Sequence, residues 1–279
     1  MSPFFFFVFR AKAQPVSADI RGRVLHRGRG GRLLRGIYTA ASGMLVQATQ
    51  TDVISNNLAN VDTPGYHRKS PHVRSFPEIL LHREQQGRHT PVGTLGTGAV
   101  VDGGRFSFQP GRIQATNNPL DAALPEHGFF TVAAGDGTRY TRDGRFSLSE
   151  TGWLVQQDGY RVLGEQGPIF IGREGEVQID SRGDVRVDGV LRDRLLIVEF
   201  NEREGLIRRG QGLYEASPEA GDPFRFRGVV LQGALEMPNV NVVKEMVHMI
   251  EVHRSYEANQ KVVQAYDETL SKAVNEIAG

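Results

Sequence analysis

The sequence predicts an α+β fold, with long N- and C-terminal helices that pair as a coiled coil and a central, mainly antiparallel β domain. A heptad-spaced stripe runs from Leu34 to Asn60, a second stripe fills the last four heptads, and Asp-Gly pairs separate short apolar runs between them. A seven-residue period keeps one helix face against a partner, and Asp-Gly pairs suit the tight turns of hairpins. The 279 residues suffice for a body with its own core.

The N-terminal stripe predicts a helix within residues 34–64. Its members recur at alternating steps of four and three residues: Ile37, Ala41, Met44, Ala48, Thr51, Ser55 and Leu58. Most of these side chains are small, so the helix alone buries too little apolar surface to be stable and needs a partner. Pro64 ends the pattern, because proline cannot continue a helix and biases Thr63 out of the helical region.

The C-terminal stripe predicts the partner helix within residues 232–279. Asn239 or Asn241, which follow Pro238, can cap its first amides. Asn259 is the single amide in the stripe, and it either fixes the register of the pair or lies at a hydrated edge. The members follow a three-four alternation without a break: Met249, Val252, Tyr256, Asn259, Val263, Tyr266, Leu270, Ala273 and Ile277.

Residues 106–231 are predicted to form the β domain. Asp-Gly pairs at positions 136–137, 143–144, 158–159 and 188–189 supply residues suited to positive φ. The runs beside them, such as Phe129 to Val132 and Leu195 to Val198, have the length and composition of strands. Residues 65–105 contain several prolines and glycines, and they are predicted to be an extended connector that can add a hairpin.

Residues 1–33 are predicted to lie outside the folded body. The first 32 residues carry seven Lys or Arg against one acid and lack periodicity. They are either a basic, disordered extension or a mis-assigned start; a signal peptide is a third reading, but the apolar run from Phe4 to Phe9 is short and no positive charge precedes it. Because the whole chain has a net charge of +1, the remainder is acidic and offers no argument for a nucleic-acid partner.

No motif for catalysis, a cofactor or a metal stands out. The chain has no cysteine, which excludes disulfides and thiol nucleophiles. His248 and His253 are five residues apart and so lie on different sides of a helix, and the glycines from Gly93 to Gly98 lack the context of a phosphate-binding loop. No apolar run is long enough to span a bilayer. We expect a structural protein that is not an enzyme, is not inserted in a membrane and binds no cofactor or small-molecule substrate.

Several segments resemble bacterial flagellar rod and hook proteins. The likeness covers residues 34–279, nearly the whole patterned part of the chain. The segments that carry it are Ser42 to Met44 and Ile54 to Tyr66 for the N-terminal signature, Asn117 to Leu124, Gly128 to Phe130 and Thr138 to Phe146 for the central domain, and Gln232 to Glu236 and Tyr256 to Lys261 for the C-terminal helix.

The resemblance implies a structural subunit of the flagellar basal-body rod, which self-assembles with other rod and hook axial proteins into the drive shaft that carries motor torque to the hook. It also implies export by the flagellar type III apparatus without a cleaved signal peptide. Gly167 to Ile169 resemble the proximal rod type, which is slightly favoured over the distal rod. The alternative is a soluble, β-rich binding module on a homodimeric coiled coil.

The two stripes and an asparagine cluster are the expected assembly interface. Neither stripe buries enough alone, so each is expected to be mobile in the monomer and to order on incorporation. The amides of Asn56, Asn57 and Asn60 either cap the helix end or bond a neighbour. The expected interface residues are Ile37, Ala41, Met44, Ala48, Thr51, Asn56, Asn57, Leu58, Asn60, Met249, Val252, Tyr256, Asn259, Val263, Tyr266, Leu270, Ala273 and Ile277.

Overall fold

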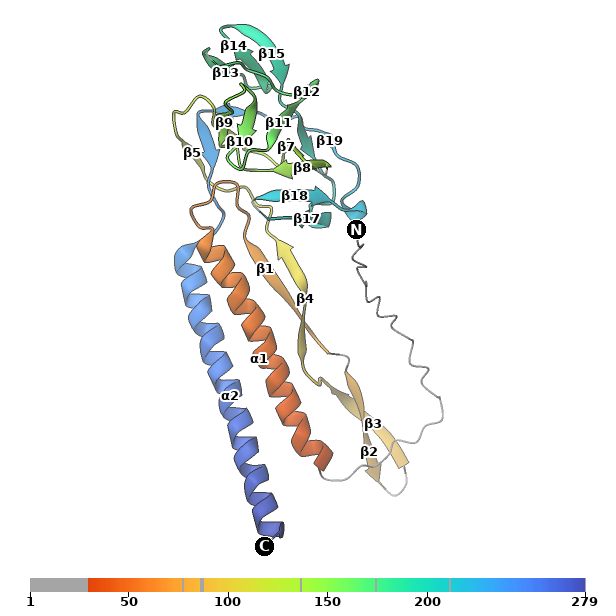
Figure 1. Cartoon of the computed structure of the whole chain (residues 1–279). Coiled ribbons are helices and arrows are strands. Elements are labelled where there is room, and N and C mark those ends of the chain that lie inside the picture. Colours follow the sequence, from red (N-terminus) through yellow and green to blue (C-terminus); the bar gives the residue numbers. More distant parts are fainter. Residues whose placement is uncertain are drawn as a thin grey trace, which may run out of the picture.

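The structure, a computed structural model, describes residues 30–278 except 77, 86, 87, 136, 174 and 211, with side chains described outside 30–34, 79, 81–89, 277 and 278. Nearly all of the extension expected over residues 1–33 therefore lies outside the described residues. Figure 1 shows an elongated molecule in which a pair of helices extends from one end of a β domain, with a narrow ribbon of strands beside it.

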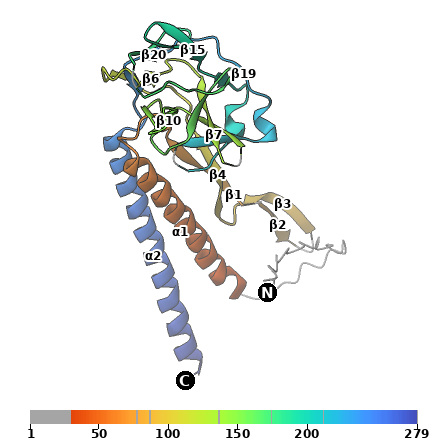
Figure 2. The same cartoon turned by 45° about the horizontal axis from the view of Figure 1, so that its top comes forward.

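Helices α1 (Gly30–Ala59) and α2 (Val242–Ala278) run antiparallel and side by side (Figures 1 and 2). Asn241 caps α2, since its side chain accepts a hydrogen bond from the amide of Lys244 at 3.0 Å. Between the helices, Asn259 Nδ2 donates to Gln47 Oε1 at 3.1 Å. This bond and the contacts around it define the register of the pair.

A two-part β ribbon follows α1. Strand β1 (Lys69–Ser75) pairs antiparallel with β4 (Ala99–Phe106), and β2 (Ile79–Gln85) pairs with β3 (Arg88–Leu95). Thr39 Oγ1 donates to Thr97 O at 3.2 Å, and the amide of Ala99 donates to Ser42 Oγ at 3.3 Å. These bonds tie the ribbon to α1, so the segment expected as a connector over 65–105 is mostly paired strand.

The β domain is built on a ten-stranded sheet in the order β17-β18-β8-β7-β11-β10-β9, with β12, β16 and β19 attached off this path. A three-stranded sheet, β13-β14-β15, and the pairs β20-β6 and β21-β5 complete it. Its elements are β5 (Ile113–Ala115), β6 (Ala122–Ala123), β7 (Phe129–Ala134), β8 (Gly137–Thr141), β9 (Phe146–Leu148), β10 (Leu154–Gln156), β11 (Arg161–Gly164), β12 (Gly167–Pro168), β13 (Val177–Ile179), β14 (Asp184–Val187), β15 (Val190–Arg194), β16 (Ile197–Glu199), η1 (Arg203–Gly205), β17 (Leu206–Arg208), β18 (Leu213–Ala216), η2 (Pro218–Ala220), β19 (Phe224–Arg225), β20 (Leu231–Gln232) and β21 (Ala234–Glu236).

Two apolar clusters form the core of the β domain. Along β7, Phe130 and Val132 belong to the larger cluster, whereas Phe129 belongs to a smaller one with Phe200 and Tyr214. This division follows from the two-residue period of a strand, which sends neighbouring side chains to opposite faces. The smaller cluster is mainly aromatic, with the rings of Phe129 and Tyr214 5.7 Å apart and nearly perpendicular.

One of the Asp-Gly pairs illustrates how the hairpins turn. Asp188 and Gly189 have φ angles of 51° and 80°, and the residues on either side, Val187 and Val190, are paired across β14 and β15. A two-residue hairpin turn requires positive φ at both central positions, which Asp-Gly tolerates well.

The predicted fold class is wrong. Instead of an α+β body organised by a coiled coil, the described chain is mainly β, with twenty-one strands and only two α-helices. Along α2, Val252 is the one buried member of the predicted seam, and the other members with described side chains are half-buried. A helical stripe extends over a long continuous segment and is easily recognised in a sequence. Most of these strands have two to four residues, which is too short to show a recognisable alternation of apolar and polar residues.

Candidate functional site

The structure brings the predicted seam residues together within one chain. On α1 the side chains of Ile37, Ala41, Met44, Thr51 and Leu58 are half-buried, and Ala48 is exposed. On α2 the seam faces α1, as shown by Asn259, which lies against both Gln47 and Gly43. Val252 is buried there, the side chain of Ile277 lies outside the described ones, and the half-buried members are Met249, Tyr256, Asn259, Val263, Tyr266, Leu270 and Ala273.

The asparagine cluster divides into one buried and two more open residues. Asn57 is fully buried, Asn60 is half-buried and Asn56 is exposed. Asn57 Oδ1 accepts hydrogen bonds from Tyr66 Oη and from the amide of Lys69, both at 3.0 Å. Its Nδ2 donates to the carbonyl of Lys69 at 2.8 Å and to Glu245 Oε2 on α2 at 3.3 Å. Asn57 therefore connects α1, the start of the ribbon and α2.

Glu245 and Asn239 extend these connections toward the β domain. Glu245 is buried in the first turn of α2 and accepts a hydrogen bond from Arg68 Nε at 2.5 Å. The amide of Arg68 donates to Asn239 Oδ1 at 2.7 Å, and Asn239 Nδ2 donates to the carbonyls of Ser107 and Gln109. The residues that enter α2 are thus bonded to those that leave α1 and to those that leave β4.

A buried ion pair lies beside these residues. Arg142 Nε is 2.9 Å from Glu236 Oε2, and both side chains are 1% exposed. Glu236 Oε1 also accepts the amide of Gly111 at 2.9 Å and lies 3.5 Å from His67 Nε2. Arg142 Nη1 donates to the carbonyls of Glu126 and Gly128. Glu236, on β21 just before α2, is therefore bound to the main body of the β domain.

Burial and neighbouring charges shift the pKa values of Glu236 and Arg142 in opposite directions. Burial raises the pKa of Glu236, but the contact with His67, the charge of Arg142 and the amide of Gly111 outweigh it, so the pKa is lowered from its usual value. Burial lowers the pKa of Arg142, against the opposing effect of Glu236. In the neighbouring aromatic cluster, burial raises the pKa of Tyr214 to about 12. The carboxylate of Glu236 is thus held charged in the interior.

Close backbone approaches complete the arrangement. Gly65 has a φ of 69°, its amide donates to the carbonyl of Glu236 at 2.8 Å, and a Cβ at this position would lie 2.5 Å from the backbone of Arg142 and Asp143. A side chain there would separate the loop after α1 from the β domain. We call the polar cluster that joins the helix pair, the ribbon and the β domain the joint; it consists of Asn57, Tyr66, His67, Arg68, Arg142, Glu236, Asn239 and Glu245.

Of the joint, only Asn57 is among the interface residues that the sequence predicts. Arg142 and Glu236 lie in the family-like segments, but no local pattern gives them a role, because their pairing joins positions 94 residues apart in the chain. The signal that could have identified Glu245 was its place in the first turn of a helix, where a carboxylate is favoured. The charged groups of the joint pair with one another, which suits a rigid connection between the helix pair, the ribbon and the β domain.

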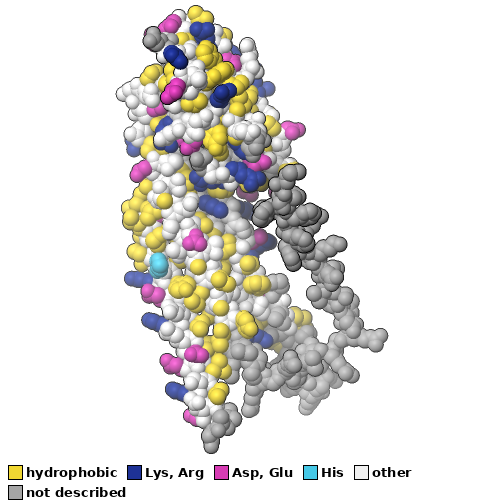
Figure 3. All heavy atoms as spheres, viewed as in Figure 1, with side chains coloured by type: hydrophobic (Ala, Val, Ile, Leu, Met, Phe, Trp, Pro, Cys, Tyr) yellow, Lys and Arg dark blue, Asp and Glu magenta, His cyan; other side chains and the backbone are white. Residues whose placement is uncertain are grey.

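Apolar side chains remain exposed on the other faces of the helices. Tyr38 and Leu45 on α1 are 70% and 71% exposed, and they lie seven residues apart on one face. On α2 the exposed side chains of Val243, Met246, Val247 and Ile250 follow helical spacing near the β domain. Figure 3 shows hydrophobic side chains gathered on the upper part of α2 and along the helix pair. We call these two sets the α1 patch and the α2 patch.

Two further features of the described residues concern metal binding and membrane insertion. Among the described residues, no group of three or more His, Cys, Asp or Glu is arranged to hold a metal ion. Within the same part of the chain, neither helix is long and apolar enough to cross a membrane.

Comparison with known proteins gives consistent matches along the chain. Residues 37–67 match the family "Flagella basal body rod protein", residues 123–187 match "Flagellar hook protein FlgE/F/G D1 domain", and residues 231–276 match "Flagellar basal body rod FlgEFG protein C-terminal". The three matched segments cover most of both helices and much of the β domain.

Individual relatives match over most of their length. The flagellar hook-basal body complex protein FlhO of Bacillus subtilis is 32% identical over 268 residues, which is 88% of this chain and 99% of that protein. The flagellar basal-body rod protein FlgG of the same species is 32% identical over 87% of this chain and 99% of its own length. FlgG of Agrobacterium fabrum is 34% identical over 85% and 97%.

Proposed function

Because the chain belongs to the flagellar basal-body rod protein family and is a structural subunit of the rod, we propose that the α1 patch and the α2 patch are its contacts with neighbouring axial subunits. Most of the predicted seam residues are half-buried in the helix pair of one chain, whereas Ala48 and Asn56 are exposed, and an assembly role for these residues stays a prediction. The single observation that carries the proposal is the exposure of two sets of large apolar side chains on the outer faces of the same helices.

The positions of the patches suit an open assembly. Asn57 lies beside Glu245, and Gly43 lies beside Asn259, which gives the register of the pair. At 1.5 Å per residue, the α1 patch and the α2 patch are then offset by about 20 Å along the helix axis. A contact between the α1 patch of one subunit and the α2 patch of the next joins two different surfaces. Where the rotation between successive subunits does not close a ring, such a contact extends into a helical filament.

The joint supports a mechanical role for the subunit. The protein lies in the flagellar basal body and assembles with other axial flagellar proteins. Torque passing along the rod must cross from the helix pair to the β domain within each subunit. A largely buried network of hydrogen bonds that includes the ion pairs Arg142–Glu236 and Arg68–Glu245 resists changes in the angle between the helix pair and the β domain better than a flexible linker. We propose that the chain acts in this way and not as an enzyme.

Two finer points rest on the family alone. We propose that the subunit reaches the rod through the flagellar export apparatus without a cleaved signal peptide, which mass spectrometry of its N-terminal peptide in purified basal bodies tests. The preference for the proximal over the distal rod stays a prediction. Labelling the subunit in basal bodies and imaging the label relative to the hook distinguishes the two positions.

Cysteine cross-linking tests the proposed contact directly, because the chain has no cysteine of its own. The variant Leu45→Cys with Val247→Cys places one thiol in each patch. Within one chain these positions are about 15 Å apart along the axis, too far for a disulfide, so a bond between them must join two subunits. After oxidation, rods of the double variant are expected to give disulfide-linked dimers, trimers and larger species, seen as a ladder of bands in electrophoresis without reductant.

The matched control is Asp52→Cys with Glu257→Cys, which places exposed thiols on the polar parts of the same helices. An equal ladder from this control, or assembled rods of the patch variant without any ladder, would refute the proposed contact. A product that stops at dimers would indicate a pair of fixed size.

A further inference from the structure

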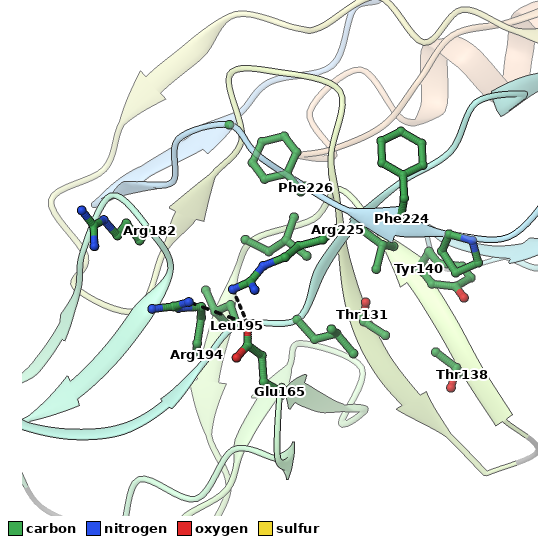
Figure 4. A pocket seen from close by; sticks show the side chains of 15 residues that line it. Thr131, Thr138, Tyr140, Glu165, Arg182, Arg194, Leu195, Phe224, Arg225 and Phe226 are labelled. Carbon is green, nitrogen blue, oxygen red and sulfur yellow. Dashed lines mark hydrogen bonds and ion pairs between the residues drawn. The ribbon is translucent and has the colours of Figure 1, made fainter.

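A cavity of about 390 Å³ opens in the β domain, and none of its lining residues belongs to the joint or to the patches (Figure 4). It lies among β7, β8, β16 and β19. Leu195, Ile197 and Phe226 give it an apolar lining. Its volume is within the range of roughly 300–1,000 Å³ that is usual for small-molecule sites. Assembly through the helices makes no use of this space.

Two hydroxyl groups that line the cavity have no hydrogen-bond partner among the described residues. Thr131 is 1% exposed, and its Oγ1 has no hydrogen-bond partner among the described residues. Tyr140 is directly paired with Thr131 across β7 and β8, so both side chains lie on the same face of the sheet. Its hydroxyl also has no hydrogen bond within the described part of the chain. Buried hydroxyls are nearly always bonded, so the Thr131 hydroxyl is available to whatever polar group enters the cavity.

The opposite side of the cavity carries a surplus of arginine. Arg225 Nη2 donates to Glu165 Oε1 at 2.5 Å, and Arg194 Nη1 lies 3.8 Å from the same oxygen. Arg182 also lines the cavity and has no ion pair within the described residues. Figure 4 shows the arginines and Glu165 on one side and Thr131, Thr138 and Tyr140 on the other. Arg194 Nε also bonds Asp184, so three guanidinium groups meet two carboxylates, of which only Glu165 lines the cavity.

We propose that this cavity binds a carboxylate attached to an apolar body. The hydroxyls of Thr131 and Tyr140 donate to the carboxylate oxygens, the arginines supply the complementary charge, and Leu195, Ile197 and Phe226 contact the apolar part. An acidic side chain of a neighbouring axial subunit and a free small carboxylate have the same chemistry. Comparing the binding of a small carboxylate to the monomer and to assembled rods distinguishes these two ligands.

Binding of 4-phenylbutyrate to the full-length purified chain, followed by calorimetry, tests the proposal. We expect saturable binding, and we expect the neutral analogue 4-phenylbutyramide to bind about tenfold more weakly, because it lacks the charge. Thr131→Val keeps the shape of the side chain and removes the hydroxyl, so it should weaken binding by about tenfold at unchanged thermal stability. Tyr140→Phe is the second variant and should act in the same direction.

Thr151→Val and Arg186→Gln are matched controls, since neither residue lines the cavity, and both should bind like the unmodified chain. Absence of saturable binding, equal affinity for the acid and the amide, or unchanged affinity in Thr131→Val and Tyr140→Phe would overturn the proposal. Binding to monomers but not to rods assigns the natural ligand to a neighbouring subunit, and equal binding to both assigns it to a free carboxylate.

Discussion

Arg142 and Glu236 form an ion pair, 2.9 Å between Nε and Oε2, at the point where the chain leaves the β domain for α2. Both side chains are buried, and each has further partners in the backbone around it. Two charges in the interior require each other, because either one alone would remain without compensation. This pair is therefore the part of the joint most sensitive to substitution.

Removing one charge of the pair should strongly destabilise the β domain. Glu236→Gln keeps the size of the side chain but leaves the guanidinium of Arg142 buried without its counter-charge, which typically costs about 3–5 kcal/mol. Urea unfolding followed by the fluorescence of the single tryptophan measures the change. Glu204→Gln is the control, because Glu204 and Arg105 form an exposed pair at 3.9 Å and should contribute little. Similar losses in the two variants would contradict the role of burial.

The lowered pKa of Glu236 predicts a loss of stability in acid. In the unfolded chain a glutamate has a pKa of about 4.3, so between that value and the lower folded pKa only the unfolded state binds the proton. The stabilisation is complete above about pH 4.3 and is lost as the pH falls through the folded pKa. Unfolding free energies measured from pH 7 to pH 3 should fall less steeply for Glu236→Gln, and an unchanged slope would be inconsistent with a charged Glu236.

The sequence identified some elements and missed the connections between them. The Asn241 cap and the Asp188-Gly189 turn depend on residues a few positions apart, and the structure contains both. The predicted fold class was wrong because many strands have only two to four residues, and local patterns underestimate how much of the chain such short strands make up. Arg142 and Glu236 meet only after the β domain has folded, so no spacing in the sequence indicated their contact.

The role of the seam shows a second limit of sequence analysis. A heptad stripe indicates that a helix packs against a partner, but it does not indicate whether the partner helix belongs to the same chain. Asn259 and Gln47 meet within one subunit, while Leu45 and Val247, which are not in the predicted seam, are exposed. The apolar side chains on which the proposed contact between subunits rests therefore lie outside the heptad stripes.

Asn57 should tolerate substitution far less well than its neighbour Asn56. Asn57→Leu removes the bond to Glu245 Oε2 and both bonds to the backbone of Lys69 at a buried site, at a cost of about 1–3 kcal/mol for each buried group left unpaired. Asn56→Ala removes one of the two oxygens that accept the Tyr66 hydroxyl, on an exposed residue, and should cost little. Thermal unfolding of both variants checks this. Comparable melting temperatures would show that Asn57 is not the connection between the helices and the ribbon.

Tyr214 predicts a separate loss of stability in alkali. Its pKa of about 12 lies above the usual value of 10, because burial disfavours the phenolate. The folded state therefore holds this proton more tightly, and the resulting stabilisation is complete below pH 10 and is lost as the pH rises through about 12. Tyr214→Phe has no such proton, so its unfolding free energy should decline less between pH 10 and 12. Equal declines would place the phenol in contact with solvent.

Gly36 should be required for the close approach of the two helices at their far end. A Cβ at Gly36 would collide with the Tyr266 hydroxyl and lie 2.5 Å from Cζ of the ring, whereas a Cβ at Gly43 would lie 2.9 Å from the amide nitrogen of Asn259, the end of a smaller side chain. In an exposed helix, replacing Gly by Ala stabilises by about 1 kcal/mol. Gly36→Ala should instead separate the helices and increase hydrogen exchange in α2 around Tyr266, and Gly43→Ala should have a smaller effect. Slower exchange in Gly36→Ala would mean that helix propensity outweighs packing at this position and that the helices are not held together there.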